Sequence, residues 1–450
     1  MTAAMSHEDL GARLLESVNA RTATAGVIGL GYVGLPLAAA IAKAGFKTIG
    51  FDVDPSKPPQ LNAGQSYIDA VKNDDLASLV ASGSFRATTD MGGLATCDVI
   101  VICVPTPLTR HREPDVSFIE ATTQVVAQHM RPGQLVSLES TTYPGTTDEV
   151  VRPILEARGF KSGCDFFLGF SPEREDPGNQ SFETVTIPKV IAGDGAEASR
   201  LMQAFYGAVV KHVVPVSTPA VAEAVKITEN VFRAVNIALV NELKVIYDAM
   251  GIDVWEVIDA AKTKPFGYMP FYPGPGLGGH CIPIDPFYLT WKSREFEVPT
   301  RFIELAGEIN TSMPRYVIKR LEEAVDTHLG MALGRARVLV IGLAYKKNVS
   351  DIRESPSFKI MELIEKRGGT CDFSDPHVPV ITPTREHAEF NGRRSVDLTA
   401  AKLASYDAVV ISTDHDAVDY ALIAQEARLV IDTRNALERR GIAGPNCVKA

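Results

Sequence analysis

The sequence predicts an α/β protein in which two doubly wound parallel sheets are joined by a long central helix and a helical middle domain. Three observations support this fold class. Short apolar runs alternate with helical stretches near both ends of the chain, as expected for parallel strands that are buried on both faces. Residues 219–250 carry one uninterrupted helical pattern. At 450 residues, the chain is long enough for two or three domains.

The first predicted sheet begins with residues 25–54, where a short apolar strand, a glycine turn, an Ala-rich helix and a second apolar strand follow one another. This is the order of a βαβ unit, and its second strand ends at Asp52. Three more apolar runs extend the sheet: "CDVIVICVPTP", "QLVSLEST" and "FFLGFSPE". We therefore expect a Rossmann-like first domain over residues 1–214.

The central helix is predicted to begin at Pro219 and to end just before Gly251, a placement of Pro and Gly that is typical of helix termini. Apolar residues occupy most of its circumference, so we expect it to be buried, either between domains or in a dimer interface. The helical middle domain is expected over residues 215–327.

A second doubly wound domain is predicted over residues 328–450. It begins with the apolar strand in "RARVLVIGLAYK", continues with a helix over residues 357–367, and contains the further apolar runs "GTCDFSDP" and "YDAVVIST". Its glycine turn is incomplete, because Ala344 and no third glycine follow Gly342. This domain therefore need not hold a dinucleotide.

The composition excludes several classes of protein. A net charge of −10 leaves no basic surface of the kind that binds nucleic acid. The six cysteines include no CxxC pair, unlike a disulfide framework or a zinc site, and a reducing cytoplasm is expected. The first 21 residues mix charges with apolar residues and do not resemble a signal peptide. Residues 25–42 are apolar, but their glycines and proline indicate a strand, a turn and a helix instead of a membrane span.

Gly29, Gly31 and Gly34 match the GxGxxG pattern, in which the glycines permit a tight turn, close approach of a pyrophosphate and packing of the helix on the strand. Alone, the pattern could be a turn without a ligand. Here it lies between a strand and a helix, and the carboxylate of Asp52 can accept the ribose hydroxyls of NAD, whereas it would repel the 2′-phosphate of NADP. The residues expected to contact NAD in this region are Gly29, Gly31, Tyr32, Val33, Gly34 and Asp52.

Cys281 lies in the segment "GPGLGGHCIPIDP". An isolated cysteine is most often an apolar filler of a core. Here the flanking glycines permit close approach, the prolines stiffen the segment and Asp285 follows four residues later, so we expect a thiol that a substrate can reach. On an extended segment His280 would point away from Cys281, and no further His or Cys is near in the sequence. No metal site is therefore expected.

Two further groups of polar residues are candidates for chemistry. Lys226 and Asn230 share one face of the central helix; Lys226 could simply extend its ammonium to solvent, or the pair could stabilise an oxyanion and favour a nearby thiolate. Glu139, Thr141 and Glu173 follow predicted strands at the end where open α/β sheets bind ligands. Each alone is more commonly a capping or surface residue, and together they are predicted to form the rim of one crevice.

In their order and spacing, these motifs resemble the UDP-sugar 6-dehydrogenase family, which includes UDP-glucose, UDP-N-acetylglucosamine and UDP-N-acetylmannosamine dehydrogenases. The likeness covers almost the whole chain, from "GVIGLGYVGLPLA" through "ESTTYPGTT" and "AVKITENVFRAVNIALVNE" to "GLAYKKNVSDIRESP". The segments "VPTPLTRHREPD", "FSPEREDPGN" and "FYPGPGLGGHCIPIDPFYL" are most similar to bacterial UDP-N-acetylglucosamine 6-dehydrogenases of surface-polysaccharide pathways.

The resemblance implies that two successive hydride transfers oxidise the C6 alcohol of a UDP-sugar to the uronate, with consumption of two NAD+ and one water. It assigns Cys281 to attack on the intermediate aldehyde, which gives a thiohemiacetal and then a thioester that water cleaves. Covalent capture would also keep the aldehyde from escaping.

The resemblance also implies roles for other residues. Lys226 and Asn230 match an oxyanion-stabilising pair, and Asp285 matches the partner that acts as a base or positions water. Glu173 matches the residue assigned to thioester hydrolysis, and Thr141 an active-site threonine. The remaining matches are Thr106 and Thr141 for NAD, and Phe271, Tyr272, Gly276, Gly278, Lys346 and Arg353 for the UDP-sugar.

Two departures from the UDP-glucose enzymes bear on the substrate. Those enzymes usually carry a segment of the Ser-Pro-Glu-Phe-Leu type, whereas Glu175 and Asp176 stand here, and their roles are open. They also favour Gly-Gly-Ser-Cys followed by Lys-Asp, whereas this chain has "GGHCIPID". The difference favours an N-acetylhexosamine substrate.

The expected protein is a cytoplasmic UDP-N-acetylglucosamine 6-dehydrogenase that forms a homodimer or a higher homo-oligomer. Its nearest alternatives oxidise UDP-N-acetylmannosamine or UDP-glucose, because the sequence does not resolve an epimer. A single-step hydroxy-acid dehydrogenase would release one NADH for each substrate and would not need Cys281. A non-catalytic NAD-binding scaffold is disfavoured by the intact set of Cys, Lys, Asn and Asp.

Overall fold

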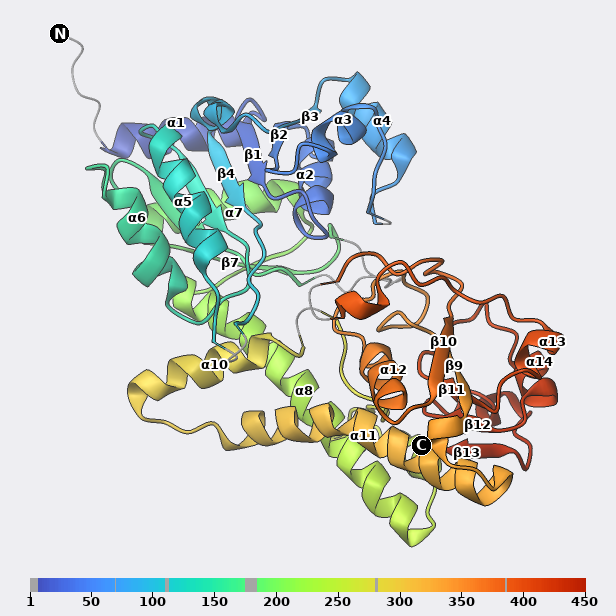
Figure 1. Cartoon of the computed structure of the whole chain (residues 1–450). Helices are drawn as coiled ribbons and strands as arrows, with labels where there is room; N and C mark the ends of the chain where they lie inside the picture. Colours follow the sequence, from blue (N-terminus) through green and yellow to red (C-terminus); the bar gives the residue numbers. More distant parts are fainter. Residues whose placement is uncertain (1–6, 69, 110–112, 175–183, 280–281, 385–386) are drawn as a thin grey trace. The chain divides into compact units, whose positions relative to one another are not determined.

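The computed structural model describes residues 7–68, 70–109, 113–174, 184–279, 282–384 and 387–450 (Figure 1). The chain folds into two compact units. Unit 1 consists of Met1–Glu229 and Phe287–Val298, and unit 2 consists of Asn230–Pro286 and Pro299–Ala450. Each unit contains one doubly wound sheet with helices on both faces (Figure 1).

Unit 1 is built on a sheet of eight strands in the order β3-β2-β1-β4-β5-β6-β7-β8. The strands are β1 (Thr24–Ile28), β2 (Lys47–Phe51), β3 (Phe85–Thr88), β4 (Val99–Ile102), β5 (Leu135–Leu138), β6 (Phe167–Phe170), β7 (Lys189–Gly193) and β8 (Val213–Pro215). Neighbouring strands are parallel, as predicted, except that β7 is antiparallel to β6. An antiparallel neighbour needs no helical crossover.

Helices cover both faces of this sheet (Figure 1). They are α1 (His7–Asn19), α2 (Gly34–Lys43), α3 (Lys57–Asn62), α4 (Asn73–Ala81), α5 (Ser117–His129), α6 (Arg152–Glu156) and α7 (Ala196–Val209), with the short turns η1 (Met91–Thr96) and η2 (Thr147–Val151). Successive residues of a strand point to opposite faces. Val27 accordingly packs with Phe205 of α7, whereas Ile28 packs with Val126 of α5 in a second cluster. The strands are therefore apolar on both faces, which is why they appear in the sequence as continuous runs.

Helix α8 (Pro219–Met250) has the bounds that the sequence predicts. It is followed by α9 (Val254–Ala261), α10 (Asp285–Ser293), η3 (Arg294–Phe296) and α11 (Arg301–Leu329). Gly251, at φ 71°, ends α8 in the left-handed conformation that glycine adopts without strain. Within the single chain, α8 is less buried than expected, because Phe232 and Leu239 are each 50% exposed.

Unit 2 contains a five-stranded parallel sheet in the order β10-β9-β11-β12-β13. Its strands are β9 (Arg337–Ile341), β10 (Thr370–Ser374), β11 (Ala408–Ile411), β12 (Val430–Asp432) and β13 (Cys447–Lys449), and its helices after α11 are η4 (Leu333–Arg335), α12 (Pro356–Lys366), η5 (Ala388–Phe390), α13 (Ala400–Leu403), α14 (Tyr420–Glu426) and η6 (Glu438–Arg440). Val340 and Ile341 belong to different core clusters on the two faces of β9. The second doubly wound sheet that the sequence predicts is therefore present.

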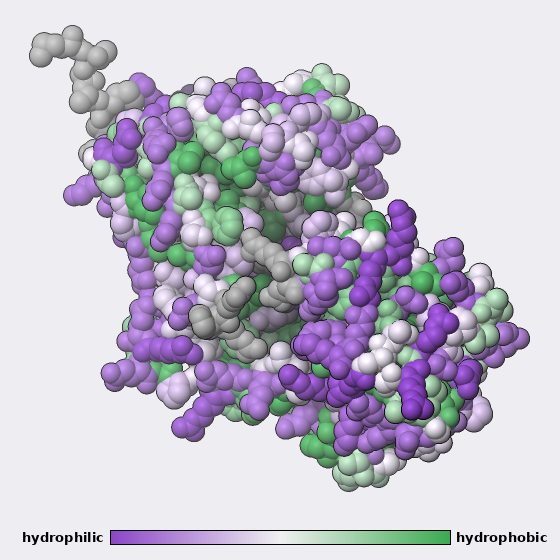
Figure 2. Space-filling view, viewed as in Figure 1, coloured by the Kyte–Doolittle hydropathy of each residue, from purple (hydrophilic) through white to green (hydrophobic). Residues whose placement is uncertain are grey.

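The surface of unit 2 is predominantly hydrophilic in the view of Figure 2, with scattered apolar residues. Among the described residues, none of the helices combines the length and the hydropathy that crossing a membrane would require.

Candidate active site

The three glycines of the turn in unit 1 have different roles. Gly29 and Gly34 are needed for the backbone packing of the turn, whereas Gly31 leaves open space. Gly29 has φ 90°, and its N–H donates to Phe51 over 2.8 Å. A Cβ on Gly29 would overlap the carbonyl of Cys103, and a Cβ on Gly34 would overlap the carbonyl of Gly29. A Cβ on Gly31, by contrast, would meet no atom within 4 Å. The turn therefore has room at Gly31 for the pyrophosphate of a dinucleotide beside the N-terminus of α2.

Asp52 stands at the end of β2 and is 5% exposed. Its Oδ2 accepts hydrogen bonds from the Leu30 N–H at 2.9 Å and from the Lys57 ammonium at 2.7 Å. The carboxylate thus holds the glycine turn through Leu30 and binds the ammonium of Lys57. Sequence reasoning missed Lys57; its place in the turn after the strand, five residues beyond the acid, was the available signal.

The other predicted NAD contacts gather at the same end of the sheet. Tyr32 is exposed and Val33 is half-buried, just before α2. Thr106 follows β4 and is buried, and its carbonyl accepts a hydrogen bond from the hydroxyl of Tyr288. Thr141 follows β5 and is half-buried. Since these segments follow the carboxyl ends of parallel strands, they lie where open α/β sheets bind ligands.

The prediction that Glu139 lies on the rim of this crevice is wrong. Its side chain is fully buried, and its carboxylate binds Lys189 at 2.7 Å and the hydroxyl of Tyr206 at 2.5 Å. Burial raises the pKa of Glu139, an effect that the Lys189 ammonium opposes. Buried charges need such partners, and these partners stand far from Glu139 in the sequence.

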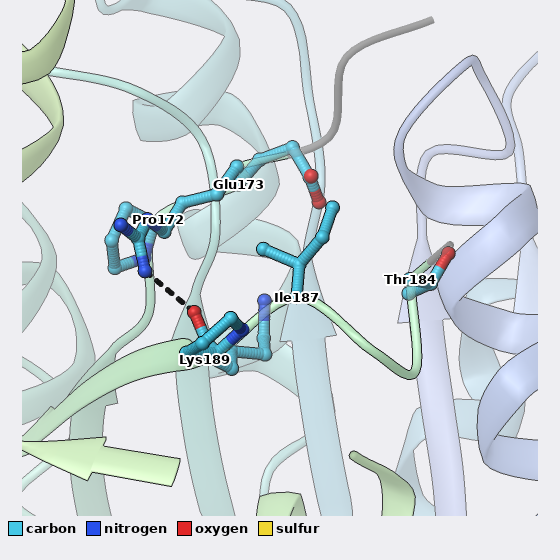
Figure 3. Close-up of a pocket in the computed structure, with 7 residues that line it drawn as sticks. Pro172, Glu173, Thr184, Ile187 and Lys189 are labelled. Carbon is cyan, nitrogen blue, oxygen red and sulfur yellow. Dashed lines mark hydrogen bonds between the residues drawn. The ribbon is translucent and has the colours of Figure 1, made fainter. Parts of the chain in front are cut away.

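Glu173 follows β6 and is half-buried. It lines a small pocket whose wall includes Ile187 and Lys189 (Figure 3). The negative charge of Glu173 also contributes to the raised pKa of Glu139. Glu175 and Asp176, whose roles the sequence leaves open, lie outside the described residues.

Asn230 and Asp285 are brought together in unit 2. The Asn230 amide donates to Asp285 Oδ2 over 2.5 Å, and the two side chains are buried. Asp285 is the first residue of α10. Lys226, one helical turn before Asn230 on α8, is 6% exposed, so its ammonium does not simply extend into solvent. Cys281, together with His280, lies outside the described residues.

The predicted substrate loop packs on protein at its glycines. A Cβ on Gly276 would lie 3.1 Å from Pro356, and one on Gly278 would lie 2.5 Å from the Cβ of Tyr345. Phe271 and Tyr272 are half-buried. Gly276 therefore serves close packing on α12, and Gly278 serves close packing on the loop between β9 and α12. These reasons for the glycines differ from the clear path to Cys281 that the sequence suggests.

Lys346 and Arg353 lie on that same loop between β9 and α12. Lys346 is half-buried and Arg353 is exposed. The guanidinium of Arg353 binds the carboxylate of Asp351 through two nitrogens, at 3.0 and 2.6 Å. Such a bidentate pair fixes the direction of an arginine.

Sequence reasoning missed Arg434, which follows β12 in the same way that Asp52 follows β2. Its Nε donates to the carbonyl of Ser412 over 2.7 Å. Its guanidinium packs on Gly274, where a Cβ would lie 2.5 Å from Nη1. Burial lowers the pKa of Arg434, an effect that the charges of Asp414 and Asp432 oppose. A half-buried cation at the carboxyl end of this sheet suits an anionic ligand.

Within the described ranges, no three His, Cys, Asp or Glu side chains come together in a group that could hold a metal ion.

Three family models match consecutive parts of the chain. The NAD binding domain of the UDP-glucose/GDP-mannose dehydrogenase family matches residues 23–210, the central domain of that family matches residues 220–312, and its UDP binding domain matches residues 339–439.

Similar proteins differ in the sugar that they oxidise. The chain is 35% identical over 378 residues to the UDP-N-acetyl-D-glucosamine 6-dehydrogenase of Pseudomonas aeruginosa, with 81% of this chain and 88% of the relative covered. It is 34% identical over 418 residues to the UDP-N-acetyl-D-mannosamine dehydrogenase of Pyrococcus horikoshii, with 92% and 95% covered. A solved structure of the UDP-D-ManNAc dehydrogenase from Pyrococcus horikoshii superposes with a TM-score of 0.83 at 33% identity, covering 92% of this chain and 96% of that one.

Proposed function

The chain belongs to the UDP-glucose/GDP-mannose dehydrogenase family of NAD-dependent enzymes, and on this premise we propose that it oxidises the C6 alcohol of UDP-N-acetyl-D-glucosamine to the uronate. The observation that carries the proposal is the buried contact of Asn230 with Asp285, four residues after Cys281 in the sequence. Burying a carboxylate and an amide costs free energy unless they are hydrogen-bonded, so a buried pair at this place is a candidate for a role in catalysis. The "GGHCIPID" segment favours an N-acetylhexosamine over glucose, and the likeness of "VPTPLTRHREPD", "FSPEREDPGN" and "FYPGPGLGGHCIPIDPFYL" to UDP-N-acetylglucosamine 6-dehydrogenases favours the glucosamine epimer.

NAD+ supplies the acceptor of hydride from C6. The chain's own residues bind and orient it: the space at Gly31 admits the pyrophosphate, the N-terminus of α2 directs N–H groups toward it, and Asp52 accepts the ribose hydroxyls. Thr106 and Thr141 complete the proposed contacts at the ends of β4 and β5.

In the proposed first step, C6 loses a hydride to NAD+ and its hydroxyl loses a proton, which leaves an aldehyde. The thiolate of Cys281 then adds to the aldehyde carbon, and the oxyanion that forms is stabilised by the Lys226 ammonium and the Asn230 amide. Burial of both side chains strengthens such an interaction, since water does not screen it.

In the proposed second step, the thiohemiacetal loses a hydride to a second NAD+ and becomes a thioester. Water then attacks the thioester carbon, the carbon–sulfur bond breaks, the thiol of Cys281 is regenerated and the uronate is released. Glu173 accepts a proton of the attacking water, while Asp285 positions water or acts as a base. Overall, one alcohol, two NAD+ and one water give one carboxylate, two NADH and three protons.

The proposed substrate contacts come from unit 2. Lys346, Arg353 and Phe271 would bind the UDP-sugar, with Tyr272 and the glycine segment at their side. Arg434 joins this group in our proposal, because its cation suits the diphosphate.

We further propose that the enzyme is a homodimer of the cytoplasm. Phe232, Leu239 and Ile246 recur at intervals of seven residues along one side of α8 and are 50, 50 and 45% exposed, and α11 adds Phe302 and Leu305, at 77 and 52%. Such an apolar stripe favours burial against a second copy. Sedimentation of the enzyme with Leu239→Lys should give monomers, and an unchanged dimer would contradict this interface. The cytoplasm is favoured by the spacing of the six cysteines, which include no CxxC pair.

The substrate is tested by measuring kcat/KM with UDP-N-acetylglucosamine, UDP-N-acetylmannosamine and UDP-glucose in one assay of NADH release. We expect UDP-N-acetylglucosamine to be preferred by about tenfold or more, a difference of about 1.4 kcal/mol in transition-state binding. An equal or higher kcat/KM with either of the other two sugars would overturn the substrate assignment.

A further inference from the structure

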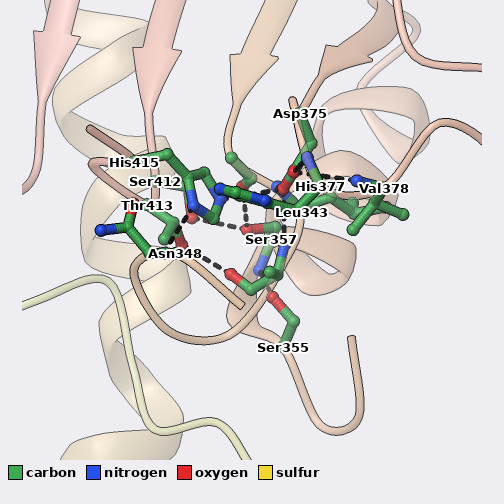
Figure 4. A network of polar contacts seen from close by, with 12 residues as sticks. Leu343, Asn348, Ser355, Ser357, Asp375, His377, Val378, Ser412, Thr413 and His415 are labelled. Carbon is green, nitrogen blue, oxygen red and sulfur yellow. Dashed lines mark hydrogen bonds and ion pairs between the residues drawn. The ribbon is translucent and has the colours of Figure 1, made fainter. Parts of the chain in front are cut away.

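A buried histidine joins two parts of unit 2 that the proposed mechanism does not use. His415 follows β11 and is 0% exposed. Its Nδ1 accepts a hydrogen bond from the backbone N–H of Asn348 at 2.9 Å, and its Nε2 lies 3.0 Å from Asp375 Oδ2 (Figure 4). A backbone N–H can only donate, so Nδ1 is the acceptor and the proton is on Nε2, which donates to Asp375.

Asp375 ties this histidine to the sheet. Its Oδ2 also accepts the N–H groups of Leu343 and Ala344, at 2.6 and 2.9 Å, and its Oδ1 accepts those of His377 and Val378, at 2.7 and 3.1 Å (Figure 4). Burial raises the pKa of Asp375, but these hydrogen bonds, together with the bond to His415, hold it below its ordinary value. Asp375 is therefore an ionised anchor whose position is fixed by backbone donors.

The Asn348 N–H belongs to the loop of residues 343–355, between β9 and α12, on which Lys346 and Arg353 lie. The loop departs from ordinary backbone conformation at Asn348, where φ is 59°. The other end of the loop binds the glycine segment, since the carbonyl of Arg353 accepts the N–H of Gly279 at 3.0 Å. The ring of Tyr345 packs directly on Gly279.

We propose that His415 is a positioning residue that holds the 343–355 loop in its UDP-binding conformation by linking Asn348 to the Asp375 anchor. The inference rests on the proposed function, because Lys346 and Arg353 enter it as substrate-binding residues. Through Gly279, the same loop also sets the start of the segment that contains Cys281. The expected consequence is on substrate affinity more than on the chemical step.

Other contacts limit the size of the effect. Thr413 Oγ1 donates to the carbonyl of Ala344 at 2.7 Å, and Asp416 binds both Lys347 and the Asn348 amide at 2.6 Å. These bonds remain when His415 is replaced. Loss of one buried hydrogen bond should therefore weaken UDP binding about tenfold without abolishing it.

The test compares three variants of His415 by calorimetric titration of the full chain with UDP and by steady-state kinetics. For His415→Phe we expect the Kd for UDP and the KM for UDP-N-acetylglucosamine to rise about tenfold, with kcat changed less than about threefold. His415→Asn offers an amide oxygen at the place of Nδ1 but does not reach Asp375, so its affinity for UDP should lie between those of the parent and His415→Phe. His415→Gln reaches Asp375 but leaves Asn348 without its acceptor, and should bind UDP more weakly than His415→Asn.

His377 provides the matched control. Its ring lies 4.9 Å from that of His415 between centroids, and its Nε2 has no hydrogen-bond partner among the described residues. His377→Phe should leave UDP binding unchanged. Equal losses in His377→Phe and His415→Phe would overturn the proposal, as would unchanged UDP binding by a folded His415→Phe.

Two further outcomes distinguish failure of the His415 proposal from failure of the proposed function. If His415→Phe does not fold, as judged by thermal melting, UDP binding by His415→Asn no tighter than by His415→Gln would overturn the proposal. If the parent oxidises none of the UDP-sugars, the proposed function fails, whereas the UDP titrations still decide the role of His415.

Discussion

The glycine turns of the two sheets have the same backbone but different surroundings. Gly29 and Gly342 have φ of 90° and 83°, and each donates its N–H over 2.8 Å to the last residue of the adjacent strand, Phe51 or Ser374. In each unit an aspartate follows that strand and accepts the N–H of the leucine after the glycine, Leu30 to Asp52 and Leu343 to Asp375. The same local sequence therefore builds the same turn twice.

The difference lies in what occupies the turn. In unit 1, Gly31 leaves open space and Asp52 is reached by Lys57 from the surface. In unit 2, the second glycine is replaced by the buried Ala344, and the acid is covered by His415. The comparison teaches that the turn itself is a structural device, and that a dinucleotide site needs in addition an empty second position.

The largest expected effect is on NAD+ affinity, and it comes from filling the open space at Gly31 of unit 1. Gly31→Val should fold normally, because a Cβ there meets nothing within 4 Å, but its side chain would occupy the pyrophosphate position. NAD+ affinity should fall at least about a hundredfold, or about 2.7 kcal/mol, with little change in Tm. The control is Ala344→Gly in unit 2, for which NAD+ binding should not change. Unimpaired NAD+ binding by Gly31→Val would contradict the placement of the cofactor.

The second effect tests what the turns share. At Gly29 and Gly342 an added Cβ overlaps a carbonyl oxygen, that of Cys103 or Thr413, and alanine disfavours the left-handed conformation. Gly29→Ala and Gly342→Ala should each lower the free energy of unfolding by about 2 kcal/mol, as measured by urea denaturation. A loss in one variant but not in the other would show that the two turns are not equivalent.

The third effect distinguishes the two acids by ligand. Asp52→Asn should weaken NAD+ about tenfold and leave UDP binding unchanged, since it loses a charged acceptor for the ribose. Asp375→Asn should do the reverse, weakening UDP through the 343–355 loop. Titration of both variants with both ligands measures the four affinities, and loss of NAD+ binding in Asp375→Asn would contradict the assignment.

The smallest expected effect is on stability, and it concerns the buried lysine that each unit contains. Lys189 in unit 1 is paired with Glu139, whereas Lys244 in unit 2 is 2% exposed and faces the rings of Trp255 and Tyr316, with centroids at 4.5 and 5.6 Å. Burial lowers the pKa of Lys244 to about 8. The folded protein then binds fewer protons than the unfolded chain above that pH, so stability rises as pH increases from about 8 toward the ordinary lysine value.

Lys244→Met should therefore stabilise the protein by about 1 kcal/mol at pH 7. The gain should shrink as pH rises above 8, because the parent lysine is then neutral in the folded state. Thermal melting at pH 7 and pH 9.5 measures both quantities. Lys189→Met should destabilise the protein, since it leaves Glu139 buried without its cation. If both variants destabilised the protein, the two buried lysines would not differ in the way described.

Local patterns in the sequence were sufficient for the Gly29 turn, the bounds of α8 and eight strands, because each depends on residues close together in the chain. Those strands are β1, β2, β4, β5, β6, β9, β10 and β11, whereas β3, β7, β8, β12 and β13 were not identified from the sequence. Contacts between distant residues were not predictable in the same way. The burial of Glu139 depends on Lys189 and Tyr206, 50 and 67 residues away. Lys57 and Arg434 follow strands at ligand-binding ends and could have been found from that position. Nothing near His415 in the sequence indicates its link to Asn348.

The glycines before Cys281 show a second limit of local patterns. Glycine indicates close approach, but the sequence does not say of what. At Gly278 the approaching group is Tyr345 of the 343–355 loop, which stands 67 residues later in the chain.

The central claim is that one thiol carries the sugar through two oxidations, and the number of NADH molecules formed for each UDP-N-acetylglucosamine consumed tests it most directly. The account predicts two NADH and one uronate for the parent enzyme, and no uronate for Cys281→Ser. A ratio of one NADH to one substrate in the parent, or undiminished formation of uronate by Cys281→Ser, would contradict it.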